Sequence, residues 1–262
     1  MKRLYGLLKK EFALMKGWLY GTLLISIVLM AIAGIGTSTR SVEWINNSMI
    51  FGFVFLVLIC IYLFIPMIVL LESLKTEWQR ADIWLHSPST IFQLFGSKVL
   101  FSGFVGLINI GTSVVLFLVY AGIFGSPVDE LSFNDLIIFI AILVYSFYTI
   151  SLLIMCLGLF FRVLYHLIKP TMNSFAMPVL VLLFIVLAWT NEKVKSTVLY
   201  QKITTLGPIG DPLKEPFYLE KGMFFIGPTE PVIYSGEILL SLVYLVILFV
   251  VSAVLFERKV RL

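Results

Sequence analysis

The residues that could carry out catalysis are few and scattered in this sequence. The only histidines are His86 and His166, and neither belongs to a His-Glu-x-x-His pair of metal ligands. A serine or cysteine nucleophile needs a base within reach, but both histidines fall in segments that we expect to be cytoplasmic loops. The carboxylates that metal-dependent phosphotransfer would cluster are spread out, at Asp82, Asp129, Asp135 and Asp211. The pattern therefore disfavours an enzyme.

The sequence also lacks a loop of the kind that usually holds the phosphates of ATP. Such a loop reads Gly-x-x-x-x-Gly-Lys-Ser/Thr, and its backbone N–H groups surround the phosphates. The nearest glycine pair, Gly106 and Gly111, is followed by Thr112 and lies inside an apolar run. We therefore expect that this chain does not hydrolyse ATP by itself.

The composition of the whole chain indicates a membrane protein. Of 262 residues, 60% are hydrophobic and 13% are charged, and the mean hydropathy is +1.03. The apolar residues form six runs of roughly 17 to 25 residues, the length that crosses a bilayer as a helix. We expect an all-α membrane protein, a single transmembrane domain whose six spans cover 18–36, 49–71, 100–123, 136–160, 174–190 and 238–256. Cys60 and Cys156 fall within spans and are expected to be small apolar filler, not metal ligands or a disulfide.

Basic residues predict the orientation, because Lys and Arg resist translocation across the membrane. With the N-terminus inside, the inner segments hold thirteen of the 19 Lys and Arg residues. Five of the other six lie in one long outer segment, 191–237, where the rule is weakest. The sequence thus predicts a multi-pass protein of the cell membrane with both termini in the cytoplasm. The net charge of +4 then reflects topology, and no nucleic-acid partner is implied.

The middles of the six spans contain no Asp, Glu, Lys, Arg or His, which disfavours coupling to an ion gradient. Glu72 and Lys98 lie at inner ends, where we expect long side chains to reach the lipid headgroups. Uncharged polar residues do occur within the spans. They could serve helix packing or line a transport pathway, and the pathway candidates are Asn109, Thr112, Tyr145 and Tyr148. Pro66 should bend the second span, as a hinge or as a static shape.

Two cytoplasmic segments have helical periodicity. In the first, 1–17, we expect an amphipathic interfacial helix, with Phe12 on its apolar face and Lys9 and Lys16 off that face. It could lie in the headgroups of membrane lipid, form a docking face for a partner, or do both. The second, 72–90, is predicted to form a short surface helix that stops at Pro88 and is either a solvated loop or a lever held by another protein.

The order of these features resembles the membrane subunit of ABC-2 type transporters. Members of that family have six spans, a basic N-terminal helix, and a coupling helix between the second and third spans. At residue level the resemblance lies in Glu72, in Leu85-His-Ser-Pro88-Ser-Thr90 and in Gly96-Ser-Lys98, although the spacing from Leu85 to Pro88 is one residue tighter than the family pattern. The layout covers nearly the whole chain, and the motif covers about 27 residues.

The resemblance implies a permease subunit that binds no cofactor itself. A separate cytoplasmic ABC ATPase would hold ATP and Mg²⁺, and a second copy of the permease or a paralogue would complete the pathway. The ATPase would contact the coupling segment, for which the candidate residues are Glu72, Lys75, Trp78, Arg80, Trp84, Leu85 and Pro88. Exported cargo would be amphipathic or hydrophobic: a peptide, an antibiotic or a lipid.

The outer segment 191–237 contains five of the ten prolines, which argues against one long helix. We expect short helices folded back on the bundle, with Met223 to Ile226 as the stretch that enters the outer leaflet. In the resembled family such a segment caps the exit path, and otherwise it is an ordered or partner-binding loop. Two functions from other classes stay open at this point: an ATP-independent carrier or channel, and a membrane scaffold.

Overall fold

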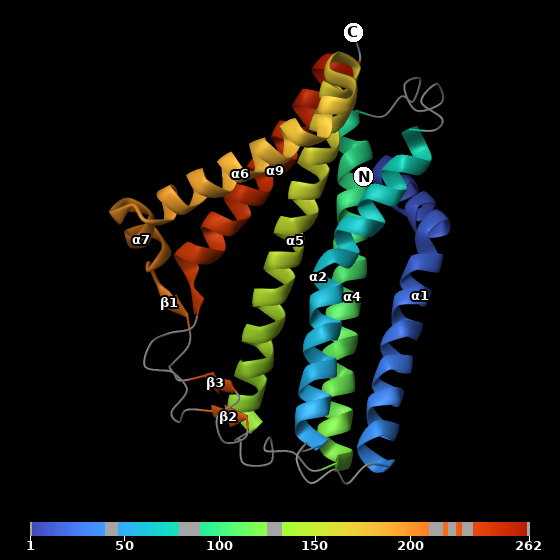
Figure 1. The fold of residues 1–262 in the computed structure, drawn as a ribbon, viewed down its shortest axis with the longest axis vertical. Helices are drawn as coiled ribbons and strands as arrows, with labels where there is room; N and C mark the ends of the chain where they lie inside the picture. The colour runs from blue at the N-terminus through green and yellow to red at the C-terminus, as the bar shows by residue number, and fades with distance from the viewer. Residues whose placement is uncertain are drawn as a thin grey trace. The chain divides into compact units, whose positions relative to one another are not determined.

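A computed structural model describes residues 2–39, 47–78, 90–124, 133–209, 217–219, 224–226 and 233–260 of the chain. The chain divides into two compact units: Met1–Met155 with Tyr218–Phe224, and Cys156–Phe217 with Phe225–Leu262. Figure 1 shows the elements along the chain, and most of the described residues lie in helices. We describe each unit by itself.

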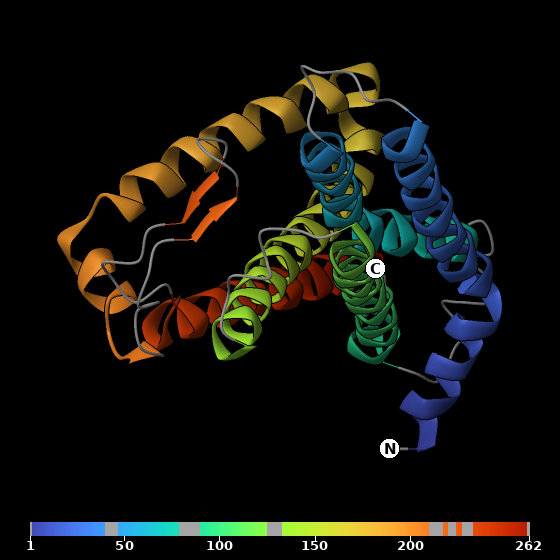
Figure 2. The same cartoon turned by 90° about the horizontal axis from the view of Figure 1, so that it is seen from below.

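Three long helices form the first unit: α1 (Lys2–Thr39), α2 (Asn47–Trp78) and α4 (Ile91–Phe124). All three pack against one another, and Figure 2 shows α2 and α4 close to end-on. The N-terminal half of α5 (Phe133–Met172) joins this unit, where the Ser151 hydroxyl donates a hydrogen bond of 3.0 Å to the carbonyl of Leu63.

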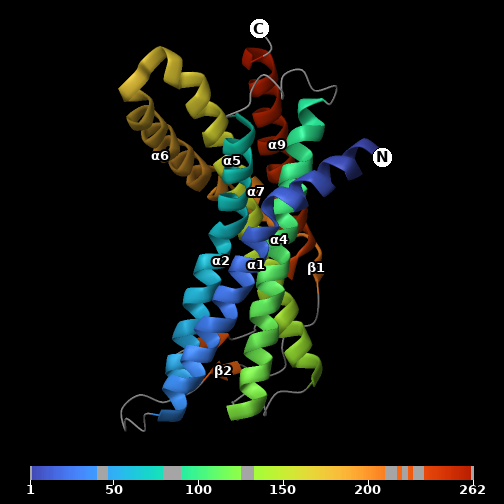
Figure 3. The same ribbon diagram turned by 90° about the vertical axis from the view of Figure 1, so that its right-hand side faces the viewer.

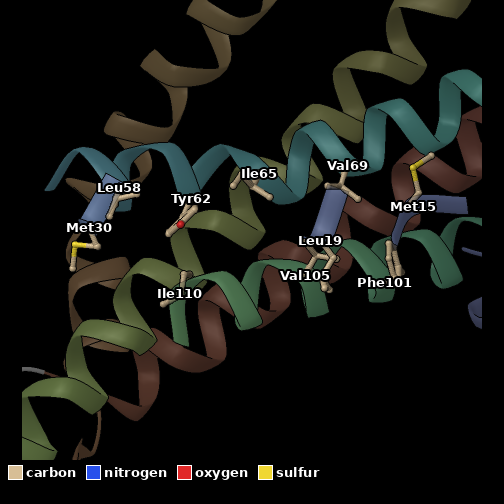
Figure 4. Close-up of a cluster of buried hydrophobic side chains, with 10 residues drawn as sticks. All are labelled: Met15, Leu19, Met30, Leu58, Tyr62, Ile65, Val69, Phe101, Val105 and Ile110. Carbon is tan, nitrogen blue, oxygen red and sulfur yellow. The ribbon is translucent and has the colours of Figure 1, made fainter. Parts of the chain in front are cut away.

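Side chains from these three helices interlock in one hydrophobic core, shown in Figure 4. The helix α1 buries one residue per turn, because a helix returns to the same face every three or four residues. This buried stripe consists of Glu11, Met15, Leu19, Thr22, Ser26 and Met30. The remaining side chains of α1 are largely exposed, as expected for a helix that meets lipid on its other faces.

The first helix differs from the expected pair of an interfacial helix and a span. Residues 2–39 form one uninterrupted helix, and in Figure 3 its N-terminal part runs at an angle to the remainder. Phe12 is 44% exposed and touches Phe101 edge-on, with ring centroids 6.4 Å apart. Lys9 and Lys16 are exposed, as expected. Whether the first turns lie in the headgroups stays a prediction.

The second unit contains the end of α5, the 3-10 turn η2 (Asn173–Phe175), α6 (Ala176–Lys195), α7 (Val198–Thr204) and α9 (Ser235–Val260). At η2 the chain reverses, so that the end of α5 and α6 form a helical hairpin (Figure 3). Asn173 has a φ of 42°, a left-handed conformation that asparagine tolerates better than most residues. Pro178 lies in the first turn of α6, where its missing N–H leaves no helical hydrogen bond unmade.

The outer segment is only partly helical. Its described residues contain α7, as expected, and four short strands: β1 (Pro208–Ile209), β2 (Phe217–Leu219), β3 (Phe224–Ile226) and β4 (Ile233–Tyr234). The strands β1 and β4 pair antiparallel, with Pro208 opposite Tyr234, and β2 pairs with β3. Within the stretch predicted to enter the outer leaflet, Phe224 to Ile226 is a strand and Met223 lies outside the described residues.

Among the described residues, five segments are long and apolar enough to cross a membrane. They are Leu4–Ile32, Val54–Trp78, Ile91–Val119, Ile140–Lys195 and Ser235–Arg258. The fourth is 56 residues long and contains most of α5 and all of α6, the helices that hold the expected fourth and fifth spans. The architecture is that of an all-α, multi-pass membrane protein, while a count of six spans stays a prediction.

A glycine at the start of α9 permits a tight junction with α7. The Gly236 N–H donates a hydrogen bond of 3.0 Å to the Leu206 carbonyl, and the Ser235 N–H donates one of 2.9 Å to the Gly207 carbonyl. A Cβ at Gly236 would overlap the carbonyl oxygen of Ile203, which belongs to the rigid backbone of α7. Only glycine fits at this position.

We predict that Gly236→Ala will separate α7 from α9, because the helix backbone has no flexible side chain to yield to the added methyl group. Hydrogen exchange of the amides in 197–209 should then become faster. Gly21→Ala in α1 is the matched control, since a Cβ there meets nothing within 4 Å. Unchanged exchange in the Gly236 variant would contradict this packing.

Candidate functional site

A buried cluster of charged side chains joins three helices of the first unit, and we call it the buried ion network. At its centre is Lys98, whose side chain is 1% exposed. The Lys98 ammonium lies 2.8 Å from Glu11 Oε1 and 3.2 Å from Glu77 Oε2, and it donates a hydrogen bond of 2.5 Å to Ser73 Oγ. Ser73 in turn donates to Glu11 Oε2 over 2.6 Å. All three protons of the ammonium therefore have an oxygen nearby.

A fifth residue closes the network at its edge. Lys10 Nζ lies 2.6 Å from Glu77 Oε1, and its side chain is 49% exposed. The buried part, Glu11, Glu77 and Lys98, carries one net negative charge, and Lys10 balances it. The network of two carboxylates and two ammonium groups is thus neutral, which lowers the cost of holding it away from water.

The helices place these residues by simple periodicity. Ser73 and Glu77 are four residues apart near the end of α2, so they lie on the same face one turn from each other. Glu11 begins the buried stripe of α1, and Lys98 lies in the second turn of α4. The network therefore brings together the end of α2, the start of α4 and the N-terminal part of α1.

The structure corrects the expectation that Lys98 reaches the headgroups. Its ammonium points to acids inside the helix bundle and is buried. The attraction of two carboxylates within ion-pair distance outweighs the hydration that the Lys98 ammonium would gain by extending to the headgroups. The Glu72 side chain is 39% exposed and pairs at 3.1 Å with Lys75 in the next turn, and its reach to the headgroups stays a prediction.

The other predicted coupling residues are placed only in part. Trp78 is the last residue of α2 and is half-buried. Arg80, Trp84, Leu85 and Pro88 lie outside the described residues. The predicted coupling segment is therefore seen only at its two ends, where α2 finishes and where Thr90 precedes α4.

A second polar group lies deeper in the same bundle. Asn109 is fully buried, as expected for an amide that is costly to leave in lipid, and its Nδ2 donates 2.8 Å to the Val105 carbonyl. Its Oδ1 has no hydrogen-bond partner within the described part of the chain. The Tyr62 hydroxyl lies near the Ser26 and Ser113 hydroxyls, so polar groups of three helices meet around these positions.

Among the remaining pathway candidates, Tyr148 makes a contact between two helices. Thr112 donates to the Ile108 carbonyl in its own helix over 2.8 Å. Tyr148 donates to the Gly103 carbonyl of α4 over 3.3 Å, and Tyr145 is half-buried on the same helix as Tyr148. The contact of Tyr148 with α4 favours helix packing for that side chain, while a pathway role for Thr112 and Tyr145 stays a prediction.

Metal ligands are not clustered in the part of the chain that the structure describes, where no group of three His, Cys, Asp or Glu residues could hold an ion. Cys60 is exposed and Cys156 is buried, and both are free thiols. Cys156 therefore fills space in the helix packing, as expected.

Sequence reasoning missed Glu11, Ser73 and Glu77 as parts of a site, although a signal existed. Glu11 is the only acidic residue among the first 42, and the same stretch carries five Lys and Arg residues before the first apolar run. A single acid in a basic segment that becomes buried needs a partner. Lys98 near the start of an apolar run needed one as well.

Comparisons with models of protein families, with curated proteins and with solved structures gave no match to this chain.

Proposed function

We propose that the chain is the permease subunit of an ATP-driven exporter, with its ATPase in a separate cytoplasmic protein. One observation supports this proposal: the buried ion network connects the helix before the segment 79–89 and the helix after it to the same carboxylate, that of Glu11. Ser73 and Glu77 precede the segment, Lys98 follows it, and Lys98 and Ser73 both bind Glu11.

The mechanical consequence supports a coupling role for this segment. A loop attached to two independent helices would absorb a push from a partner by bending. Here the helix before the segment, the helix after it and α1 are fastened together by short, buried contacts, so a push on the segment moves the three helices as one body. A permease driven by a partner needs such a connection between its contact surface and its spans.

The exposed surface of the helices is of the kind expected for a chain that lies in lipid and contacts a second permease. Large apolar side chains point outward on α6 and α9, among them Leu182 at 65% exposed and Leu239 at 60%. Apolar surface of this extent is stable only against lipid or another protein. We propose that the cytoplasmic side is the end that carries the buried ion network, in line with the distribution of basic residues.

The direct test is copurification. The tagged chain would be expressed with its chromosomal neighbours and purified in mild detergent. We expect a soluble protein with a phosphate-binding Gly-rich loop to accompany it at one copy per permease. A monodisperse permease that arrives without such a protein would count against the proposal.

We predict that Leu85→Asp will abolish retention of the ATPase while the chain still inserts into the membrane. A charge in the apolar face of a docking helix must be desolvated on binding, which removes the affinity. Leu199→Asp in α7 is the matched control, because Leu199 is a leucine that is 67% exposed in the outer segment. ATPase retained at the control level by the Leu85 variant would contradict the coupling assignment.

A second candidate, an ion-coupled carrier, draws support from the same network. Glu11, Glu77 and Lys98 are three buried ionisable residues within segments long enough to cross a membrane, and such residues often mark proton pathways. The test is transport in vesicles that contain the permease alone. Cargo uptake driven by an imposed pH gradient, and lost in Glu77→Gln, would favour the carrier over the exporter.

A further inference from the structure

Polar side chains from three helices meet inside the first unit, and we call them the buried polar cluster: Ser26 of α1, Tyr62 of α2, and Asn109 and Ser113 of α4. None of the four is more than 1% exposed. The Tyr62 hydroxyl lies near the Ser26 and Ser113 hydroxyls, and Asn109 precedes Ser113 by one turn on the same face of α4. Figure 4 shows Tyr62 within the hydrophobic core, together with Met30 and Ile110.

The two serines of the cluster use their protons within their own helices. Ser26 Oγ donates a hydrogen bond of 2.7 Å to the Leu23 carbonyl, and Ser113 Oγ donates one of 3.0 Å to the Asn109 carbonyl. A hydroxyl whose proton is used in this way can still accept a hydrogen bond, because its oxygen has two lone pairs. Both serines therefore offer acceptors to the cluster.

Two further atoms of the cluster have unused hydrogen-bonding capacity. Asn109 Nδ2 donates to the Val105 carbonyl, which fixes the orientation of the amide, but Asn109 Oδ1 accepts no hydrogen bond from the described residues. In the same part of the chain, the Tyr62 hydroxyl makes no hydrogen bond of normal length and angle. A buried polar atom without a partner is costly, so native proteins satisfy nearly all such atoms with protein groups or with ordered water.

One water molecule matches this set of atoms. Its oxygen can accept the Tyr62 O–H, and its two protons can go to Asn109 Oδ1 and to the oxygen of one serine. Buried waters in proteins typically make about three hydrogen bonds of this kind. Where polar groups lie near each other without a direct hydrogen bond, a water often bridges them.

A cation fits the cluster less well than a water does. All four side chains are neutral, and the described acid closest along α1, α2 and α4 is Glu72, ten residues after Tyr62. Ten residues of helix span about 15 Å at about 1.5 Å per residue, and Glu72 is paired with Lys75. Within these described helices, no carboxylate is close enough along the chain to offset a buried positive charge.

We propose that the buried polar cluster binds one ordered water molecule, which joins α1, α2 and α4. The water holds Tyr62 of α2 to Asn109 of α4 without direct contact between the two side chains, and a serine oxygen completes its set of partners. This site is separate from the buried ion network, and the proposal does not depend on the proposed export function.

An experimental structure of the full chain in lipid, at a resolution that shows ordered water, tests the proposal. We expect one peak of density at about 2.7 to 3.2 Å from both Tyr62 Oη and Asn109 Oδ1. A direct hydrogen bond between these two atoms, with no such peak, would overturn the proposal. So would a thermal midpoint that falls when choline replaces Na⁺ at constant ionic strength in the original chain but not in Asn109→Leu, because the occupant would then be a cation.

A double-mutant cycle provides a second measurement. Tyr62→Phe and Asn109→Leu each remove one partner of the same water, so the second change should have less effect once the first is made. We expect the unfolding constant of the double variant in detergent to differ from the product of the single effects on the order of tenfold. The matched control is Tyr148→Phe, which removes a hydroxyl that donates directly to the Gly103 carbonyl. Its effect should multiply with that of Asn109→Leu to within about twofold. Independent effects in the Tyr62 cycle, or equal coupling in both cycles, would contradict a shared water.

Discussion

Replacing Lys98 with Met will lower the free energy of unfolding by about 3 to 5 kcal/mol. The methionine has nearly the volume of lysine but no charge. Among the described residues, Glu11 then has no ion-pair partner and Glu77 keeps Lys10. A buried carboxylate without a partner is among the most destabilising defects in a protein. Thermal unfolding of the purified chain in detergent should show a fall in midpoint on the order of 10 °C.

Two further variants separate this effect from a general loss of charge. Lys75→Met breaks the exposed pair with Glu72 and should cost less than about 1 kcal/mol. Combining Glu11→Gln with Lys98→Met should be less damaging than Lys98→Met alone, because no unpaired charge is then left at position 11 and Glu77 keeps Lys10. If Lys98→Met and Lys75→Met lower the midpoint equally, Lys98 is not buried as described.

The same network also bears on the proposed coupling. If the network transmits a push from the ATPase to the spans, the Lys98→Met permease should still retain the ATPase, while transport and transport-stimulated ATP hydrolysis fall. Loss of ATPase binding in that variant, with the chain still folded, would instead place Lys98 in the docking surface itself. This comparison distinguishes a connection inside the permease from a contact with the partner.

Replacing Gly106 with Ala is expected to destabilise the bundle by about 1 to 3 kcal/mol, the usual cost of overfilling a packed core. A Cβ at this position would lie 2.5 Å from Pro66 Cγ in α2, and a proline ring cannot rotate away. The helices α2 and α4 must then move apart at their crossing. The unfolding midpoint in detergent measures the effect.

Gly111→Ala is the matched control on the same helix, five residues further along. A Cβ there meets nothing within 4 Å, so the change should stabilise α4 by about 0.5 to 1 kcal/mol through helix propensity alone. Opposite signs for the two variants would confirm the close crossing. A stabilising effect of Gly106→Ala would contradict it.

The crossing at Pro66 also shows how a local break is repaired by a distant residue. Proline has no N–H, so the carbonyl of Tyr62 loses its helical partner. The Ser151 hydroxyl of α5 lies 3.5 Å from that carbonyl and 3.0 Å from the carbonyl of Leu63. The sequence indicates the bend at Pro66. Nothing in the sequence around Pro66 indicates that the hydroxyl of Ser151, 85 residues later, would donate a hydrogen bond at this bend.

The positions of the helices follow from the sequence alone. A helix in lipid satisfies its backbone hydrogen bonds internally, so a continuous apolar run is sufficient to define it. The runs 100–123 and 238–256 accordingly fall within α4 and α9. The ends of the helices are predicted less accurately, because the helices continue past the apolar runs. The helix α2 extends to Trp78, and α5 extends to Met172.

The side chains that meet between helices were decided by the tertiary structure. Glu11 and Lys98 are separated by 87 positions in the chain, and nothing in their local sequence specifies the pairing. On α1, the periodicity predicts an apolar face that includes Phe12, whereas the fold buries the stripe that begins at Glu11. The physical reason is that helix formation is a local property of the chain, while the choice of buried face depends on which charges and small residues the neighbouring helices present.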